Sequence, residues 1–567
     1  MKILAFLAIV VAGITFAQPQ SFRSMSTGGM ILDDLDLWFS GMLFTQPVPD
    51  RLLDLDGIRV YTGLSNLSTG TDMIFEETDS TRGGFLLGGS WSPNGKPYGL
   101  GILTEFMDDR ILEDLFLNGP GGSILVSGQG EVEGTWSEYT DSDGDGTLDT
   151  RHTVYQKASG RSDSTSLSAG VYGAWAPNES LKLGLGVSMI QMTSEINSGD
   201  MNYSTTVSDS NLVSGVETYF MDNDVSGTDK DTINGLRISA SGRGTMTDKL
   251  DIGGMFQFSS LSSDMSQEIG QTGIEDFLPG ESGVYDYSVW SLSEEFTVST
   301  SGNRFGGGLD MMFQIDEDWE LEFAGTYYTM SLNGTSGDYS SNSDSTYIVT
   351  IGSLIDTTDV SMTGSGNVSR DISDNVFTGG LKISATPAKA LTISMGTMFS
   401  MYDNVNTVQY SSSNTEVETH SDGDDEFADP DDYVSTSTWS QTEETRTTNS
   451  TTRISIPVGL EFGVLPKVSV RLGASPGFVW ENEVETTNLI SASPMTTHTV
   501  YGDGTELLVV EDPWNTTDGT RIESDDSYTE IPFSYGVGYS PSDFVQIDLM
   551  GLGSSFDQWR LSATLSF

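Results

Sequence analysis

Alternation of apolar and polar residues, with a period of two, is the dominant pattern of this 567-residue chain. It is clearest at the C-terminal end, which reads W-R-L-S-A-T-L-S-F and stops on the aromatic Phe567. Because successive side chains of a strand point to opposite faces, such a run predicts a β-strand with one apolar and one polar face. Comparable runs cover residues 181–189, 305–313, 454–462 and 531–539.

Two kinds of connection separate the predicted strands. Seven are short and mostly hold Pro, Asn, Asp or Gly, as tight hairpins require: residues 92–97, 177–180, 247–248, 316–318, 387–389, 465–467 and 541–543. The others are long, polar and acidic, and cover residues 107–162, 194–232, 262–295, 334–374, 404–450 and 481–526.

Short turns at one end and long loops at the other are typical of transmembrane β-barrels. We therefore expect an all-β, antiparallel up-and-down barrel of about 16 strands, with 14 as the alternative. The short turns would be periplasmic and the long acidic loops extracellular. A propeller or a solenoid would carry a repeat of fixed length, and the sequence has none.

The chain-terminal aromatic strand resembles the closing strand of bacterial outer-membrane β-barrels. The resemblance implies that the barrel assembly machinery reads Phe567 and that the apolar faces contact outer-membrane lipid. Aromatic residues beside the short turns or at strand ends fit an interfacial girdle: Trp91, Tyr98, Trp175, Trp319, Phe544 and Trp559.

Residues 1–17 have the features of a secretory signal peptide. Lys2 precedes an apolar run, and a small residue, Ala17, ends a plausible cleavage site. The chain contains no Cys, which excludes disulfides, thiol catalysis and a lipid-anchored cysteine. An exported chain without long apolar helices fits the outer membrane of a Gram-negative bacterium.

Residues 18–55 lack a clean period and precede the barrel predicted over residues 56–567. This stretch is similar to the start of FadL-like and PorV-like barrels, and in FadL-type proteins the corresponding segment fills the lumen. We interpret it as a periplasmic leader or a lumenal plug. The residues that carry the resemblance are Ser24, Gly28, Gly29, Asp33 and Asp34.

The formal net charge is −57, from 25 basic and 82 acidic residues. Such a charge makes nucleic acid a poor partner. It is explained either by solubility or by the collection of divalent cations.

If the apolar faces meet lipid, the opposite faces line a lumen. Rings of lumenal charge set ion selectivity, so these side chains either select solutes or only pair with one another. The candidates are Lys182, Arg237, Lys382, Arg453, Arg471, Arg560, Asp251, Asp310, Glu320, Glu322, Glu461 and Asp548.

Residues 141–150 read D-S-D-G-D-G-T-L-D-T and match a calcium-loop pattern. Oxygen ligands at alternate positions wrap one cation. No Glu follows at the twelfth position, where His152 stands instead, so both Ca²⁺ binding and a plain acidic loop remain open. The candidate ligands are Asp141, Asp143, Asp145, Thr147 and Asp149.

Enzyme function is not expected, because His152, His420 and His498 fall in predicted loops without a telling catalytic spacing. The predicted function is a pore or channel for passive passage of small solutes. Two alternatives stay open: a FadL-like transporter of hydrophobic substrates with an N-terminal plug, and a barrel-anchored surface or adhesion protein with cation-binding loops.

Overall fold

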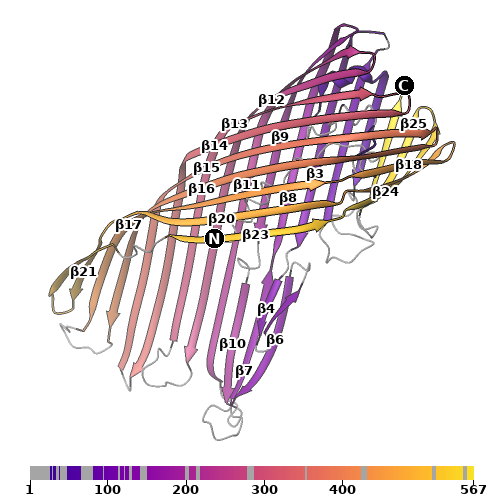
Figure 1. Cartoon of the computed structure of the whole chain (residues 1–567). Helices are drawn as coiled ribbons and strands as arrows, with labels where there is room; N and C mark the ends of the chain where they lie inside the picture. The colour runs from indigo at the N-terminus through magenta and orange to yellow at the C-terminus, as the bar shows by residue number, and fades with distance from the viewer. Residues whose placement is uncertain are drawn as a thin grey trace.

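Antiparallel strands, each hydrogen-bonded to the next, form nearly all of the described structure (Figure 1). No helix among the described residues is long and apolar enough to cross a membrane. The predicted signal peptide and calcium loop lie outside the described part. The computed structural model describes residues 26–27, 30–32, 38, 47–65, 81–93, 95–112, 115–119, 122–126, 131–140, 150–197, 203–211, 217–277, 287–351, 354–422, 431–513, 519–552 and 559–567.

Sixteen strands in the described part of the chain close into a ring, as the alternation predicts. The first and last strands pair, and the backbones of Ile58 and Phe567 exchange hydrogen bonds of 2.8 and 3.0 Å. In ring order the strands are β1 (Gly57–Ser65), β2 (Thr81–Ser92), β3 (Tyr98–Leu112), β8 (Arg161–Asn178), β9 (Leu181–Asn197), β11 (Glu217–Thr247), β12 (Leu250–Phe277), β13 (Tyr287–Gln314), β14 (Trp319–Ile351), β15 (Leu354–Ala388), β16 (Leu391–Ser421), β18 (Val458–Leu465), β19 (Val468–Ala474), β24 (Phe533–Ser542), β25 (Val545–Leu552) and β26 (Trp559–Ser566).

The outer surface of this ring carries an apolar band. On β9 the odd-numbered positions from Leu181 to Met189 are exposed, while Gly184, Gly186 and Ser188 face inward and are buried. All seven predicted short turns join neighbouring strands. Exposed aromatic residues lie beside them, namely Trp91, Tyr98, Trp175, Trp319 and Phe544. The band therefore has the outward apolar face and aromatic edge of a lipid-facing barrel.

The predicted long loops are mostly wrong in conformation, because the strands continue through them. β14 is 33 residues long and β15 is 35, whereas about 9–11 residues cross a membrane. Beyond the apolar band both faces of these strands carry Ser, Thr, Asn and Asp, which give no apolar period to read. Further strands extend this part of the sheet: β6 (Glu131–Thr140), β7 (Thr150–Ser159), β10 (Tyr203–Asn211), β17 (Tyr433–Ser455), β20 (Gly477–Ala492), β21 (Met495–Tyr501), β22 (Glu506–Glu511) and β23 (Thr520–Glu530), with a separate hairpin of β4 (Leu115–Gly119) and β5 (Gly122–Val126).

We call the strand portions beyond the apolar band, together with these further strands, the extension. Three prolines mark where the ring meets the extension. Pro457, Pro476 and Pro532 separate β17 from β18, β19 from β20, and β23 from β24. Proline has no N–H and interrupts a strand ladder. Neighbouring backbones still bond to these prolines: Gly396 to Pro457 (3.0 Å), Ile456 to Pro476 (2.8 Å) and Ser475 to Pro532 (3.0 Å). The wall is therefore continuous from the ring into the extension.

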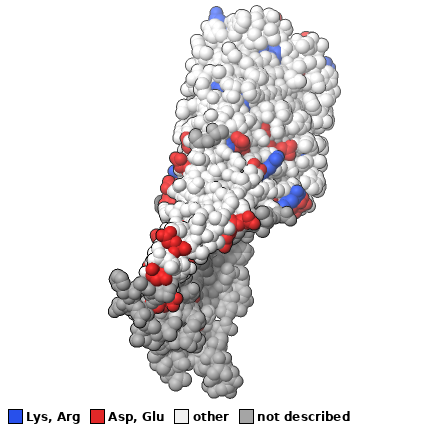
Figure 2. All heavy atoms as spheres, turned by 90° about the vertical axis from the view of Figure 1, so that its left-hand side faces the viewer, with Lys and Arg blue, Asp and Glu red and all other residues white. Residues whose placement is uncertain are grey.

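Charge is distributed unevenly between the two parts. On the face seen in Figure 2, Asp and Glu gather over the lower part of the molecule, while the upper part is nearly free of them. An upper surface with only scattered Lys and Arg among uncharged residues fits an apolar surrounding, and an acidic lower surface fits water.

Candidate functional site

The inward face of the ring is shaped to receive the N-terminal segment. Inward glycines provide the space: a Cβ added at Gly184 would lie 2.3 Å from the backbone nitrogen of Asp50, and one added at Gly101 would lie 2.6 Å from Trp38. No other residue type leaves such room. The segment's one described helix, the 3₁₀ helix η1 (Pro49–Asp54), is therefore seated directly against the wall.

Ion pairs hold η1 to three strands of the wall. Arg51 donates to Asp310 of β13 at 3.1 Å, and Arg243 of β11 contacts both Asp310 (3.1 Å) and Asp50 (3.3 Å). These side chains are at most 7% exposed. Lys182 of β9 pairs with Asp54. Three carboxylates and three cations thus balance, which is the condition under which buried charge is tolerated.

Apolar contacts accompany the ion pairs. Trp38, Leu52 and Leu55 of the N-terminal segment are almost fully buried, and the Trp38 ring meets that of Tyr172 edge to face at 6.3 Å. The wall contributes Tyr61, Leu86, Leu103, Tyr172 and Ala174 to this cluster. Residues 26–27 and Met30 are also buried, against the glycines of β16, β18 and β24. The described N-terminal residues thus contact widely separated parts of the wall.

Most of the predicted lumenal residues are engaged in ion pairs. Lys382 lies 2.5 Å from Glu322 on the neighbouring strand, and Arg453 pairs with Glu530. Arg471 contacts Glu461 at 3.1 Å and Asp548 at 2.5 Å. Together with Lys182 and Asp310, these pairs favour the pairing alternative over a free basic strip for most of the set.

The remaining predicted residues lie elsewhere on the wall. Asp251 and Glu320 are half-buried near the turn end of β12 and β14. Arg237 is buried at mid-height on β11. The backbone of Arg560 lies opposite Ser65 and Met550, and its side chain is outside the described part.

Sequence reasoning missed the residues that bind the N-terminal segment. Arg243 shares the inward face of β11 with Arg237, so continued alternation along β11 would have found it. No comparable signal marks Asp50, Arg51 and Asp54, because their stretch has no period.

A second arginine missed from the sequence lies near Arg237. Ser259 is opposite Arg237 on one side and Arg304 on the other, so that the three form a row across β11, β12 and β13. The Arg304 guanidinium lies 4.8 Å from the centre of the Tyr328 ring, a cation–π geometry. A basic layer therefore crosses this side of the interior.

On the extension side of this layer the interior holds a packed region that we call the neck. Lys230 and Glu195, at 3.2 Å, form an outward-facing pair beside it, so the neck lies beyond the apolar band. Arg370 of β15 reaches Asp231 of β11 at 2.9 Å, although three strands separate these two in the ring. The neck consists of buried Ile196, Met265, Phe296, Val298, Val368 and Val408 with the partly buried Tyr339 and Tyr410.

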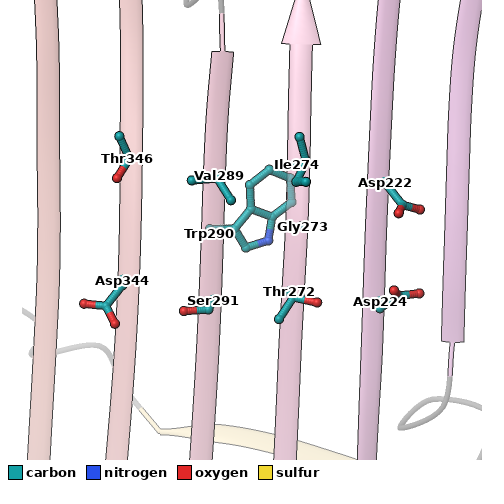
Figure 3. Close-up of a pocket in the computed structure, with 10 residues that line it drawn as sticks. All are labelled: Asp222, Asp224, Thr272, Gly273, Ile274, Val289, Trp290, Ser291, Asp344 and Thr346. Carbon is teal, nitrogen blue, oxygen red and sulfur yellow. The ribbon is translucent and has the colours of Figure 1, made fainter.

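A separate hollow lies on the extension (Figure 3). It has a volume of about 290 Å³, and Gly273 and Trp290 lie at its centre between Asp222 and Asp224 of β11 and Asp344 of β14. Only glycine fits there, because a Cβ at position 273 would lie 2.1 Å from the Trp290 ring. Carboxylates and hydroxyls around an open hollow can bind cations or hydroxyl-rich molecules.

The histidines lie on strands, not in loops as expected. His152 contacts Asp209 at 2.5 Å, His420 contacts Thr358 at 3.0 Å, and His498 contacts Glu506 at 3.3 Å. Within the described ranges, no group of three or more His, Asp or Glu side chains is arranged to hold a metal ion. The predicted calcium ligands lie between β6 and β7, outside these ranges.

No family model matches the sequence, and no curated protein sequence matches it. Solved structures give distant similarities. The toluene transporter TodX of P. putida is 11% identical, with 97% of this chain and 99% of that chain covered and a TM-score of 0.37. A Pseudomonas aeruginosa FadL homologue is 12% identical, with 96% and 97% covered and a TM-score of 0.31. A mutant of the ferric enterobactin receptor of Pseudomonas aeruginosa is 9% identical, with 90% and 80% covered and a TM-score of 0.28. Similarity at this level assigns the chain to none of these families.

Proposed function

We propose that the chain crosses the bacterial outer membrane as a sixteen-stranded barrel and passes small solutes through an interior that its N-terminal segment closes as a plug. The short turns would face the periplasm and the extension would stand outside the cell, as export by a signal peptide requires. The observation that carries this proposal is the buried, charge-balanced contact of η1 with β9, β11 and β13.

This proposal combines the two transport alternatives: it takes small polar solutes from the pore and the N-terminal plug from the FadL-like transporter. An open pore has a continuous water-filled lumen, whereas here Trp38 and Leu52 occupy the space in front of Gly101. The plug is held by buried ion pairs together with a small apolar cluster, so it would open by movement of the whole segment, after which water solvates both partners of each pair. The polar inward face, with Lys382–Glu322 and Arg471–Asp548, suits a polar solute better than a hydrophobic one.

A disulfide lock tests whether the plug must move. A Cβ at Gly99 would lie 3.5 Å from that of Leu52, within the range of a disulfide, and the chain has no native Cys to interfere. The double variant Leu52→Cys, Gly99→Cys, in liposomes, should pass solute when reduced and not when oxidised. The two single variants are the controls. Equal solute flux in both redox states, with the disulfide shown to be formed, would refute a moving plug.

Surface binding is a second candidate function, favoured by the hollow at Gly273 and Trp290 and by the length of the extension. Leu112 and Arg161 pair directly, so a short Gly-Ser turn can replace residues 113–160 without breaking the ring. A channel would keep its solute flux after this deletion. A surface protein that binds through residues 113–160 would lose adhesion to cells or glycan surfaces after this deletion, with flux absent before and after. One that binds through the hollow would instead lose adhesion in the double variant Asp222→Asn, Asp344→Asn.

A further inference from the structure

A buried carboxyl group without a hydrogen-bond partner lies against the neck. Asp229 of β11 is 0% exposed, and neither of its carboxylate oxygens has a hydrogen-bond partner among the described residues. Its direct neighbours across the sheet are Ile196 on β9 and Gln267 on β12. Since a buried ionised carboxylate normally has partners, this position is exceptional.

The charges around Asp229 do not compensate it. Asp231, two residues along the same strand, accepts hydrogen bonds from Ser263 at 2.6 Å and from Arg370 at 2.9 Å. Arg370 also donates to Asn406 of β16 at 3.2 Å. Arg370 is thus already shared between Asp231 and Asn406, and an ionised Asp229 would leave the group of Asp229, Asp231 and Arg370 with one net negative charge.

The other titratable groups facing this region are Glu294 of β13, Tyr339 of β14, Tyr410 of β16 and Glu443 of β17. The hydroxyl of Tyr339 on β14 donates to Glu294 of β13 at 3.5 Å. Burial and the charge of Asp229 raise the pKa of Tyr410, which therefore stays neutral at physiological pH. Asp229 differs from these groups in being fully buried without a hydrogen-bond partner among the described residues.

We propose that the neck is a second closure of the interior, and that the charge of the Asp229 carboxyl group controls it. With the carboxyl neutral, the apolar and aromatic side chains stay packed. With the carboxyl ionised, water and cations enter to solvate it and the neck opens. The solutes favoured by the open neck are cations, because Asp229 adds a negative charge to the neck. This role in passage rests on the proposed function.

The direction of the pH effect follows from the same contacts. Burial, opposed by Arg370 and reinforced by Asp231, raises the pKa of Asp229 from 3.8 to about 7 in the packed neck. In an open, hydrated neck the pKa would be near the ordinary value. The packed neck is therefore most stable below about pH 4, loses stability as the pH rises toward 7, and changes little above that.

Thiol labelling measures this opening without any need for conductance. Val298→Cys places the only thiol of the full chain in the neck, and Val434→Cys, at an exposed site of the extension, reports intrinsic thiol reactivity. The rate at which a charged, water-soluble reagent labels the thiol of Val298→Cys is measured at pH 5 and at pH 8. At each pH it is divided by the labelling rate of Val434→Cys, which gives a labelling ratio. We expect this ratio to rise at least about tenfold between the two pH values.

The carboxyl is then removed. Asp229→Asn should keep the ratio low at both pH values, and Asp229→Leu should do the same if the amide variant refolds poorly. Glu268→Gln, at an exposed position of the neighbouring strand β12, is the control and should leave the pH response intact. A ratio that rises equally with and without the Asp229 carboxyl, or that does not rise in the parent, would overturn the proposal. Failure of the disulfide lock with this labelling response preserved would refute the moving plug and leave the neck intact.

Discussion

Arg51 and Asp310 are 259 residues apart in the chain, yet the guanidinium of one lies 3.1 Å from the carboxylate of the other. The contact joins a segment that precedes the barrel to the eighth strand of the ring, and Arg243 holds the same carboxylate from β11. A charge shared in this way couples the position of the N-terminal segment to the wall, so the segment and the wall should respond together to substitutions here.

Removal of Arg243 tests the strength of this coupling. Arg243→Ala leaves Asp50 and Asp310 buried with one cation fewer, and breaking a buried pair typically costs about 3–5 kcal/mol. We expect a loss of about 3 kcal/mol in the free energy of unfolding, measured by urea titration in lipid. Lys230→Ala, on the outward face of the same strand, removes only an exposed pair and should cost less than about 1 kcal/mol. Equal losses in both variants would contradict a buried network.

Filling an inward glycine should expel η1 without removing a charge. Gly184→Val would place side-chain atoms where the backbone of Pro49 and Asp50 lies. Trypsin should then cleave after Arg51, which is only 5% exposed when the segment is seated. N-terminal sequencing would detect a new chain beginning at Leu52. Gly173→Ala, where the nearest atom is 3.7 Å away, should stay resistant. Resistance of both variants would show that the segment is held elsewhere.

Lumenal charge should set selectivity once the plug is removed. Neutralising Arg453 and Arg471 together, by Arg→Met changes in a chain lacking residues 18–55, frees the carboxylates of Glu530, Glu461 and Asp548. Reversal potentials in a salt gradient should shift toward cation selectivity. Lys467→Met, at an exposed turn, is the control. Unchanged potentials would mean that these residues do not face the permeation path.

Calcium binding by residues 141–149 remains a prediction from the sequence. Titration of the full chain should show one site that disappears in the double variant Asp141→Ala, Asp145→Ala, because both carboxylates belong to the alternating ligand set. A chelator should reverse the binding. Identical isotherms for the parent and the variant would leave only diffuse binding by the acidic surface.

The ring could be predicted from the sequence because lipid-facing strands have one apolar face. Leu181, Leu185 and Met189 stand at every second or fourth position for that reason, and tight turns mark the ends. The strands of the extension could not be predicted. Both faces of β14 and β15 are polar there, so these strands lack the two-residue alternation of apolar and polar positions from which a strand is predicted. Strands such as residues 334–351 therefore have the composition of loops.

The candidate site was predictable only in part. Lys182, Asp310 and Arg471 are recoverable as inward positions of alternating strands, whereas their partners depend on which strands become neighbours and on where η1 lies. The Arg370–Asp231 contact across the neck joins strands that are not adjacent, so it follows from curvature of the sheet and not from local sequence.

Conductance in a planar bilayer at pH 8, with and without residues 18–55, tests the central claim most directly. The protein from residue 18 onward should be silent or open only briefly, because its plug is seated. The chain that begins at residue 56 should give stable open-channel steps. Steps of equal size and duration in both proteins would contradict closure by the N-terminal segment, and silence in both would contradict passage through the barrel.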